Sequence, residues 1–452
     1  MGKPVMISVS GVRGIVGQGL TPELMLKFSA AAGMFYGKGS VLVGRDSRVT
    51  GNMIKHAVFS GLMSVGCDPV DIGICSTPTV EHAVKFSDAV GGIIITASHN
   101  PAEWNALKLL NRDGIFLNEE EGRRVKDIID KDLIEYVMWE NIGVSSEKTC
   151  VTSAHIKSIL SMDIIDVAKI KERKFKVALD CVNGAGSTVM PEILGELGCE
   201  IFPINMEPTG DFSHNPEPVP GNLTELCQVV RDNKADIGVA VDPDVDRCAI
   251  IDENGNPVGE EYTLVLSEKY VLEKRKGPVV ANVSTTRAVD DVAREAGVEV
   301  FRTKVGEINV VKKMIAVNAS VGGEGNGGLI LPDVHLGRDA PMAAAVILSA
   351  LAESDKTVSE LKKEVPLYYM AKNRIEIANA NADEILKKII DMSDESKLDL
   401  TDGVKINEEN YWIQVRKSNT EPIIRIMAEA ATQEKAQSLC DRYIEIIKKF
   451  TG

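Results

Sequence analysis

One pattern occurs three times along this chain of 452 residues: an apolar strand, a loop, a helix-like stretch, and a Gly-x-x step into a second apolar strand. Strands that alternate with helical segments are typical of βαβ units with parallel strand pairing. We therefore predict three related α/β domains with mixed sheets, arranged around a central cleft. The three copies cover residues 41–70, 177–202 and 279–301.

The chain after the third copy has strand and helix signals of its own from about Tyr368, and it ends in a predicted helix over residues 433–450. We expect this part to form a smaller C-terminal α+β domain. The length agrees with three to four domains. The predicted boundaries place the four domains at residues 1–150, 151–255, 256–367 and 368–452.

A distinctive loop follows each copy of the pattern. The first is Thr-Ala-Ser-His-Asn-Pro at residues 96–101, directly after the apolar run 92–95. Ligands of open α/β sheets bind at the carboxyl ends of strands, so Ser98 would present its hydroxyl group at such a site. A turn with local Ser and Asn hydrogen bonds is the alternative interpretation.

The second loop carries Asp242, Asp244 and Asp246 at alternate positions between two apolar runs. Three carboxylates this close repel one another unless a cation binds, and hard oxygen ligands suit Mg²⁺. An EF-hand is one alternative, because Glu253 stands at its last ligand position. However, Arg247 occupies the place that requires Gly, and the flanking runs look like strands. A solvated acidic turn is the other alternative.

The third loop is the glycine-rich stretch at residues 322–328, whose glycines permit close backbone approach to a ligand. Glu324 and Asn326 within it offer an acceptor and a donor–acceptor pair that suit sugar hydroxyl groups. A glycine-rich hairpin that binds no ligand is the alternative interpretation of this sequence.

A fourth motif, at residues 416–425, is a basic turn in the predicted C-terminal domain. Guanidinium groups match phosphate oxygens, so its two arginines and two hydroxyl groups favour a phosphate site. A solvated basic turn is the alternative. The candidate ligands of this turn are Arg416, Ser418, Asn419, Thr420 and Arg425.

The net charge of −15 argues against nucleic acid or an anionic membrane as a partner, and it means that an anionic substrate needs a local basic site. No run of 18 apolar residues is present, and the apolar stretch 340–351 predicts a buried helix. Eight cysteines without CxxC pairs favour a reduced, cytoplasmic protein. A monomer and a homodimer both fit the sequence.

The four motifs, in this order, resemble those of the α-D-phosphohexomutases. TASHNP resembles that family's phosphoserine loop, DPDVDR its Mg²⁺ loop, GEGNGG its sugar-recognition loop, and RKSNTEPIIR its phosphate-binding loop. The resemblance extends along the whole chain. It implies an enzyme that interconverts hexose 6-phosphate and hexose 1-phosphate through a phosphoserine and a 1,6-bisphosphate, with a small sugar phosphate as its partner.

The resemblance also implies roles for individual residues. Ser98 would carry the phosphoryl group, and Lys108 matches the position of the family's candidate general base. The expected ligands of one Mg²⁺ are Ser98, Asp242, Asp244 and Asp246. The expected catalytic residues are Ser98, Lys108, Arg13, His99 and Arg247. The residues expected to bind the sugar and its non-reacting phosphate are Glu324, Asn326, Arg416, Ser418, Asn419, Thr420 and Arg425.

The sequence around the glycine-rich loop, together with HLGRD at residues 335–339, most resembles the corresponding sequence of phosphoglucosamine mutases from one bacterial group. We therefore expect conversion of glucosamine 6-phosphate to glucosamine 1-phosphate. Two departures from common family patterns leave phosphoglucomutase or phosphomannomutase activity as the alternative: Pro243 stands where many members have Gly, and Asn326 where many have Ser. A metal-dependent phosphatase would release inorganic phosphate, and a non-catalytic sensor would have no use for Ser98.

Overall fold

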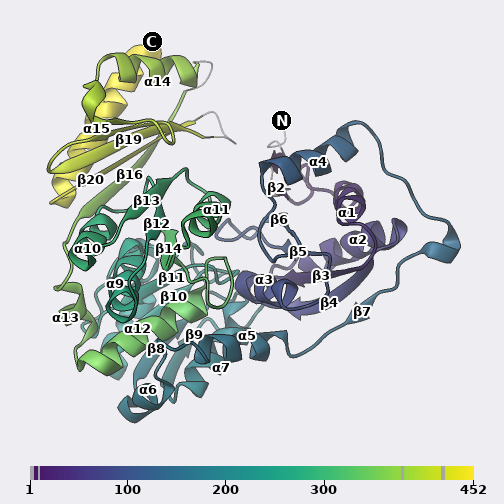
Figure 1. The fold of residues 1–452 in the computed structure, drawn as a ribbon, viewed down its shortest axis with the longest axis horizontal. Coiled ribbons are helices and arrows are strands. Elements are labelled where there is room, and N and C mark those ends of the chain that lie inside the picture. Colours follow the sequence, from purple (N-terminus) through teal and green to yellow (C-terminus); the bar gives the residue numbers. More distant parts are fainter. Residues whose placement is uncertain (1–4, 9–10, 378–380, 419–422, 452) are drawn as a thin grey trace.

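The computed structural model describes residues 5–8, 11–377, 381–418 and 423–451. Figure 1 shows four units in chain order, from the purple N-terminal unit through the teal and green units to the yellow C-terminal unit. Each unit is built around one sheet. The predicted architecture of three α/β domains and a smaller C-terminal α+β domain is confirmed.

The first unit has, in its described part, a sheet of order β1-β2-β6-β5-β3-β4-β7. β3 pairs in parallel with β4 and β5, and β6 pairs antiparallel with β5 and with β2. Its elements are β1 (Met6–Ser8), β2 (Gly11–Ile15), α1 (Pro22–Tyr36), β3 (Ser40–Arg45), α2 (Gly51–Ser64), β4 (Asp68–Ile74), α3 (Thr77–Lys85), β5 (Gly91–Ile95), β6 (Trp104–Leu110), α4 (Glu119–Asp130) and β7 (Ser146–Glu147).

The second and third units each contain a smaller mixed sheet. The second unit has α5 (Val151–Leu160), α6 (Val167–Arg173), β8 (Lys176–Asp180), α7 (Gly186–Glu196), β9 (Glu200–Ile204), α8 (Thr224–Asn233), β10 (Ile237–Val241) and β11 (Cys248–Ile251). The third has α9 (Glu260–Lys274), β12 (Val279–Asn282), α10 (Ala288–Ala296), β13 (Val300–Thr303), α11 (Glu307–Val317), β14 (Val321–Glu324), β15 (Gly328–Ile330), α12 (Ala340–Ser354) and α13 (Val358–Lys362).

The three α/β sheets share one strand order. It reads β6-β5-β3-β4 in the first unit, β11-β10-β8-β9 in the second and β15-β14-β12-β13 in the third. In each copy the first of these strands is antiparallel to its neighbour. The loop that connects this pair is the serine loop in the first unit, the acidic loop in the second and the glycine-rich loop in the third. The repeat therefore places the serine, acidic and glycine-rich loops at equivalent points of three similar sheets.

One hydrophobic core runs through the second and third units. α12 belongs to the third unit in sequence, yet it packs against α5, α6 and α7 of the second unit as well as against α9. Asp339 caps this helix by accepting a hydrogen bond from Met342 N at 3.0 Å, and Pro341 suits its first turn. The predicted buried helix over residues 340–351 is confirmed, and it joins two units into one packed body.

The C-terminal unit is an antiparallel sheet, with strand order β16-β20-β19-β18-β17 in its described part, packed against two helices. It has a hydrophobic core of its own. Its helix α15 confirms the predicted C-terminal helix. The elements are β16 (Tyr369–Glu376), α14 (Ala382–Asp391), β17 (Leu398–Asp399), β18 (Val404–Asn407), β19 (Tyr411–Lys417), β20 (Ile423–Ala430) and α15 (Gln433–Thr451).

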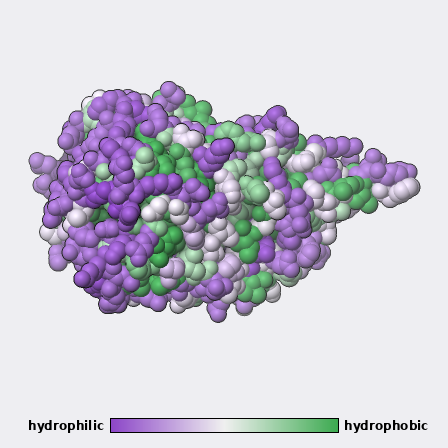
Figure 2. All heavy atoms as spheres, turned by 90° about the horizontal axis from the view of Figure 1, so that it is seen from below, coloured by the Kyte–Doolittle hydropathy of each residue, from purple (hydrophilic) through white to green (hydrophobic). Residues whose placement is uncertain are grey.

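An extended arm over residues 131–150 links the first unit to the second. It projects at the right of Figure 2, where hydrophobic (green) and polar (purple) residues alternate. Backbone hydrogen bonds from Val137 and Gly143 to α2 and the short strand β7 hold it on the first unit. Within the described ranges, no helix is both long and apolar enough to cross a membrane.

Candidate active site

A cleft of about 570 Å³ lies where the four units meet, and each of the four predicted motifs sends side chains into it. The predicted site residues that line it are Arg13, Ser98, His99, Lys108, Arg247, Glu324, Asn326, Arg416 and Arg425. The three aspartates of the acidic loop are fully buried next to Ser98. Ser418 directly follows β19, whereas Asn419 and Thr420 lie outside the described residues.

The serine loop is held by a buried arginine that the sequence analysis did not single out. Arg48 Nη2 donates hydrogen bonds to the carbonyl oxygens of Ser98 at 2.5 Å and Asn100 at 2.6 Å. Its Nη1 donates to the carbonyl oxygens of Pro101 and of Trp104, the first residue of β6. Asp46 pairs with Arg48 Nε at 3.0 Å and accepts from Thr96 Oγ1 at 2.6 Å. Because these contacts fix the backbone, Ser98 keeps a left-handed conformation with φ of 50°.

The acidic loop gathers three carboxylates behind Ser98. One oxygen from each of Asp242, Asp244 and Asp246 lies within 4.8 Å of the others, and all three residues are fully buried. Ser98 Oγ donates to Asp242 Oδ2 at 2.9 Å. The Oδ1 atoms of Asp244 and Asp246 are buried and have no hydrogen-bond partner. Buried carboxylates with free oxygens suit a hard divalent cation, so these residues fit a metal. The loop lies between β10 and β11, which excludes an EF-hand.

Charges around this loop control its protonation. Burial and the neighbouring carboxylates of Asp246 and Asp244 raise the pKa of Asp242 well above its usual value. Burial also acts on Asp244, but Lys108, whose Nζ lies 2.7 Å from Asp244 Oδ2, outweighs it and lowers the pKa of Asp244. Burial alone would lower the pKa of Lys108; its two aspartate neighbours raise it instead. Lys108 is therefore protonated in this geometry, and a role as base requires that ion pair to open.

Three further polar side chains, His99, Arg13 and Arg247, line the cleft together with Ser98. His99 Nδ1 lies 3.2 Å from Ser98 Oγ, and burial together with Arg247 and Arg13 lowers the pKa of His99 well below its usual value. His99 is therefore a neutral imidazole. Arg13, from β2, donates to Asn100 Oδ1 at 3.0 Å, and Arg247 Nη1 donates to a cleft carboxylate on Glu217 at 3.3 Å. Both guanidinium groups face the cleft, where an anion would meet them.

The glycine-rich loop presents Glu324 at the end of β14. Glu324 Oε1 accepts hydrogen bonds from Asn282 Nδ2 at 2.8 Å and from Gly306 N at 2.9 Å. Asn326 Oδ1 is buried and has no hydrogen-bond partner, so it is available to a ligand. Gly327 has φ of 88°, and a Cβ atom there would lie 2.4 Å from Cys248 O. Glycine is therefore required where this loop approaches β11.

Arg338 connects the acidic loop to the glycine-rich loop, a role that its HLGRD motif did not predict. Its Nη2 donates to Asp246 Oδ2 at 2.5 Å, its Nε donates to Glu307 Oε2 at 2.8 Å, and its Nη1 lies 3.1 Å from Glu324 Oε2. Burial would raise the pKa of Glu324, but Arg338 and the hydrogen bonds from Gly306 and Asn282 together lower it. Burial and nearby Glu81 raise the pKa of Glu307 to about 8. One cation is thus shared by three carboxylates.

The basic turn faces the other loops from the C-terminal unit. Arg416 on β19 and Arg425 on β20 are register partners, and both line the cleft. Arg416 Nε is buried without a hydrogen-bond partner, and burial lowers the pKa of this guanidinium. Ser284 Oγ donates to Gln414 Oε1 at 2.5 Å, which ties β19 to the loop after β12. This wall of the cleft therefore offers free donors to an anionic group.

Comparison with known families gives matches along almost the whole chain. Four models described as phosphoglucomutase/phosphomannomutase match in consecutive order. They are the alpha/beta/alpha domains I, II and III and the C-terminal domain, at residues 6–134, 153–255, 259–369 and 372–446.

Individual relatives cover the full length too. A phosphoglucomutase/phosphomannomutase of Thermococcus kodakarensis is 39% identical, over 99% of this chain and 99% of the relative. A phosphoglucosamine/phosphogalactosamine mutase of Sulfurisphaera tokodaii is 37% identical, over 99% of this chain and 100% of its own. The crystal structure of a phosphoglucomutase/phosphomannomutase family protein from Burkholderia thailandensis shares the fold, with a TM-score of 0.84, 24% identity and 98% coverage of both chains.

Proposed function

Because this chain belongs to the phosphoglucomutase/phosphomannomutase family, we propose that it is a phosphohexose mutase. It interconverts hexose 6-phosphate and hexose 1-phosphate through a phosphoserine and a 1,6-bisphosphate. One observation carries this proposal: Ser98 Oγ lies 2.9 Å from a buried aspartate at one wall of the cleft, while Arg416 and Arg425 occupy another. A hydroxyl group that stores one phosphoryl group therefore shares a cavity with donors for a second.

We assign Mg²⁺ to the acidic loop, with Asp242, Asp244, Asp246 and the phosphorylated Ser98 as its ligands. The free, buried oxygens of Asp244 and Asp246 support this assignment. Mg²⁺ at this position would draw charge from the phosphoryl oxygens and make phosphoserine a better donor. The protein holds the ligands ready, because the loop backbone is fixed: Asp242 Oδ1 accepts hydrogen bonds from the amides of Asp246 and Arg247.

In the transfer step, a sugar hydroxyl oxygen attacks the phosphorus atom of phosphoserine 98. The bond from phosphorus to the sugar oxygen forms, the bond to Ser98 Oγ breaks, and the hydroxyl proton passes to a base. Lys108 is the proposed proton carrier: it gives its proton to the departing Ser98 Oγ and takes up the proton that the sugar hydroxyl group loses, so it ends the step protonated. Arg13 and Arg247 neutralise charge on the transferred group, and His99 positions the serine hydroxyl.

The second half of the reaction returns a different phosphoryl group of the same bisphosphate to Ser98. The bisphosphate must therefore bind in two orientations, and the residues on the remaining walls must accept both. Glu324 and Asn326 are proposed to hold sugar hydroxyl groups, which look similar in either orientation. The residues proposed for the non-reacting phosphate are Arg416, Ser418, Asn419, Thr420 and Arg425. Each proposed domain (1–150, 151–255, 256–367 and 368–452) thus supplies one wall.

Glucosamine phosphate is the proposed sugar. One full-length relative is named a phosphoglucosamine/phosphogalactosamine mutase. The cleft offers carboxyl groups to an amino sugar, because Glu307 and Glu324 both line it. The pKa of Glu307 is raised to about 8, and an ammonium group on the sugar would favour the ionised form of this carboxyl group. Glucose or mannose phosphate is the alternative, since another full-length relative is named a phosphoglucomutase/phosphomannomutase.

A coupled assay on one preparation, with glucosamine, glucose and mannose phosphates in turn, tests both the mutase mechanism and the preferred sugar. We expect turnover of all substrates to disappear in Ser98→Ala, and kcat/KM to be highest for glucosamine phosphate. Ser60→Ala, a change at an exposed position of α2, is the matched control. Near-normal activity of Ser98→Ala would contradict the phosphoserine mechanism. Stoichiometric release of inorganic phosphate without an isomeric product would identify a phosphatase instead.

A further inference from the structure

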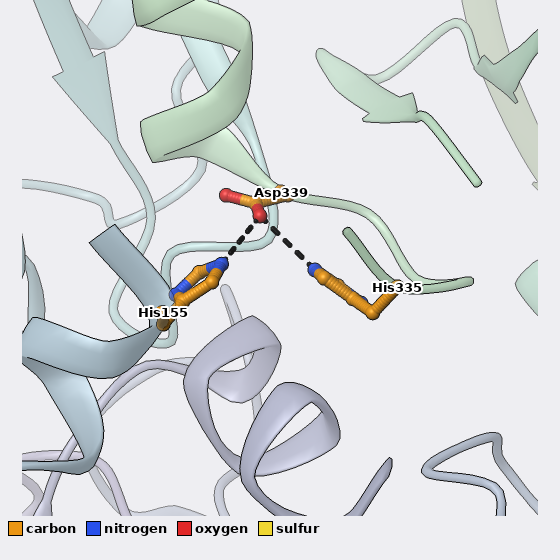
Figure 3. Close-up of side chains that lie close together, drawn as sticks. All are labelled: His155, His335 and Asp339. Atoms are coloured by element: carbon orange, nitrogen blue, oxygen red, sulfur yellow. Dashed lines mark hydrogen bonds and ion pairs between the residues drawn. The ribbon is translucent and has the colours of Figure 1, made fainter. Parts of the chain in front are cut away.

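A second group of metal-ligand side chains lies outside the cleft, at the junction of the first three units. Figure 3 shows this histidine cluster, formed by His155, His335 and Asp339. His155 belongs to α5, His335 to the loop before α12, and Asp339 to the cap of that helix. The three side chains are 0%, 1% and 0% exposed. None of them has a role in the proposed transfer of a phosphoryl group.

Both imidazole rings direct Nε2 at one carboxylate oxygen. His155 Nε2 lies 2.8 Å and His335 Nε2 lies 3.0 Å from Asp339 Oδ2, and the three atoms lie within 4.8 Å of one another. The opposite ring nitrogen of His155 is also engaged, because Nδ1 lies 3.1 Å from Thr79 Oγ1, whereas His335 Nδ1 is buried without a hydrogen-bond partner. Metal-binding histidines characteristically have the second nitrogen fixed by such a polar neighbour, because this sets the tautomer and the ring orientation.

A second buried carboxyl group lies beside the cluster. Glu81, on α3, places Oε2 at 3.3 Å from His335 Nδ1 and is 0% exposed. Both carboxylate oxygens of Glu81 are buried without a hydrogen-bond partner. In the described chain, no Lys or Arg forms an ion pair with Glu81 or Asp339. Burial raises the pKa of Glu81 well above its usual value, so this group is a neutral acid, and its buried oxygens without a partner leave room for a further donor or cation at the cluster.

A divalent ion would fit these groups. Between the two Nε2 atoms and Asp339 Oδ2, it would balance the buried carboxylate of Asp339 and take the place of the hydrogen bonds that join the three side chains. Its charge would also favour the ionised form of Glu81, whose oxygens have no hydrogen-bond partner.

We propose that His155, His335 and Asp339 bind a divalent transition-metal ion of the zinc and cobalt class. Two imidazole nitrogens and a carboxylate are donors that this class accepts. The ion would be structural and would fasten α5 to the start of α12, with Thr79 and Glu81 of α3 as outer partners. The same segment supports the catalytic loop, because Ala340 N donates to Val245 O at 3.2 Å. This site is separate from the acidic loop, whose oxygen ligands suit Mg²⁺.

Cobalt is the probe that tests this proposal on the full chain. Protein freed of metal by chelator and dialysis is titrated with Co²⁺ in excess Mg²⁺, which occupies the acidic loop. We expect one Co²⁺ for each chain, with visible d–d bands typical of nitrogen ligation, and a melting temperature that rises with Co²⁺ concentration. His155→Gln and His335→Gln should each abolish the bands. Asp244→Asn should leave them unchanged.

His82→Gln is the matched control, because His82 neighbours the cluster but pairs with Ser158 at 2.8 Å. It should bind Co²⁺ like the wild type. Wild-type protein that shows neither nitrogen-ligated Co²⁺ nor a change in melting temperature would overturn the proposal, whatever the variants do. Bands that persist in both histidine variants, or vanish in Asp244→Asn, would overturn it as well. Element analysis of untagged protein as purified identifies which ion of the class is bound.

Discussion

Replacing Arg338 by Lys should impair catalysis far more than its conservative chemistry suggests. Three guanidinium nitrogens of Arg338 contact Asp246, Glu307 and Glu324. An ammonium group is a compact point charge and cannot contact three separate carboxylates in this geometry. Glu324 would then lose the partner that orients it toward the sugar. One charge-assisted hydrogen bond is worth about 1.5–3 kcal/mol, which corresponds to a loss of about 10- to 150-fold in kcat/KM.

The assay is steady-state turnover of Arg338→Lys in both directions, together with a thermal melt to verify folding. Arg173→Lys is the matched control, because Arg173 pairs at the surface with Asp355 and should behave like the wild type. A folded Arg338→Lys enzyme within about twofold of wild-type kcat/KM would refute the reasoning, since about 0.4 kcal/mol is below the value of one such bond.

Three other predictions follow from the same geometry. Excess chelator should abolish activity, and added Mg²⁺ should restore it. Asp244→Asn should lower the affinity for Mg²⁺ without unfolding the protein. Full activity in excess chelator would contradict the assignment of Mg²⁺ to the acidic loop. Arg416→Ala should raise KM about 10- to 150-fold for both the 1-phosphate and the 6-phosphate, whereas exposed Lys417→Ala should not; an effect on one substrate only would argue against binding in two orientations. Burial raises the pKa of Glu307 from 4.5 to about 8, so the native state retains a proton that the unfolded chain releases, and wild-type stability falls as pH rises across this window. Glu307→Gln lacks this loss, so urea unfolding should show the variant gaining stability relative to wild type between about pH 5 and about pH 8; a difference that is constant with pH would exclude the raised pKa.

Much of the fold could be predicted because its signals are local. Apolar runs, Gly-x-x steps and turn residues each lie within a few positions of one another, and the threefold repeat made the domain count visible. The strand-end residues Asp46, Asp180 and Asn282 show the same regularity in the structure. Each accepts a hydrogen bond from the amide two residues later, at 3.0, 2.9 and 2.9 Å. The packing of α12 on the second unit was not predictable, because helix periodicity does not specify a partner.

The site was predictable where residues of one kind gather in a short loop, as in the acidic loop and the glycine-rich loop. Arg48, Arg338 and Glu307 were missed because each stands alone among ordinary neighbours in the sequence. Their importance comes from contacts across large sequence separations, such as Arg338 with Asp246, which lies 92 positions away. A weak signal was available: Arg338 adjoins the helix cap Asp339, and Arg48 follows the end of β3, where ligands of such sheets gather.

Transfer of a labelled phosphoryl group tests the central claim most directly. Enzyme carrying ³²P on Ser98 is mixed with unlabelled glucosamine 6-phosphate in a single turnover, and the products are separated as sugar bisphosphate, sugar monophosphate, inorganic phosphate and protein. The proposed mechanism predicts that the label leaves Ser98 for sugar bisphosphate and then appears in glucosamine monophosphate. Label that stays on the protein while product forms, or that appears as inorganic phosphate, would contradict it.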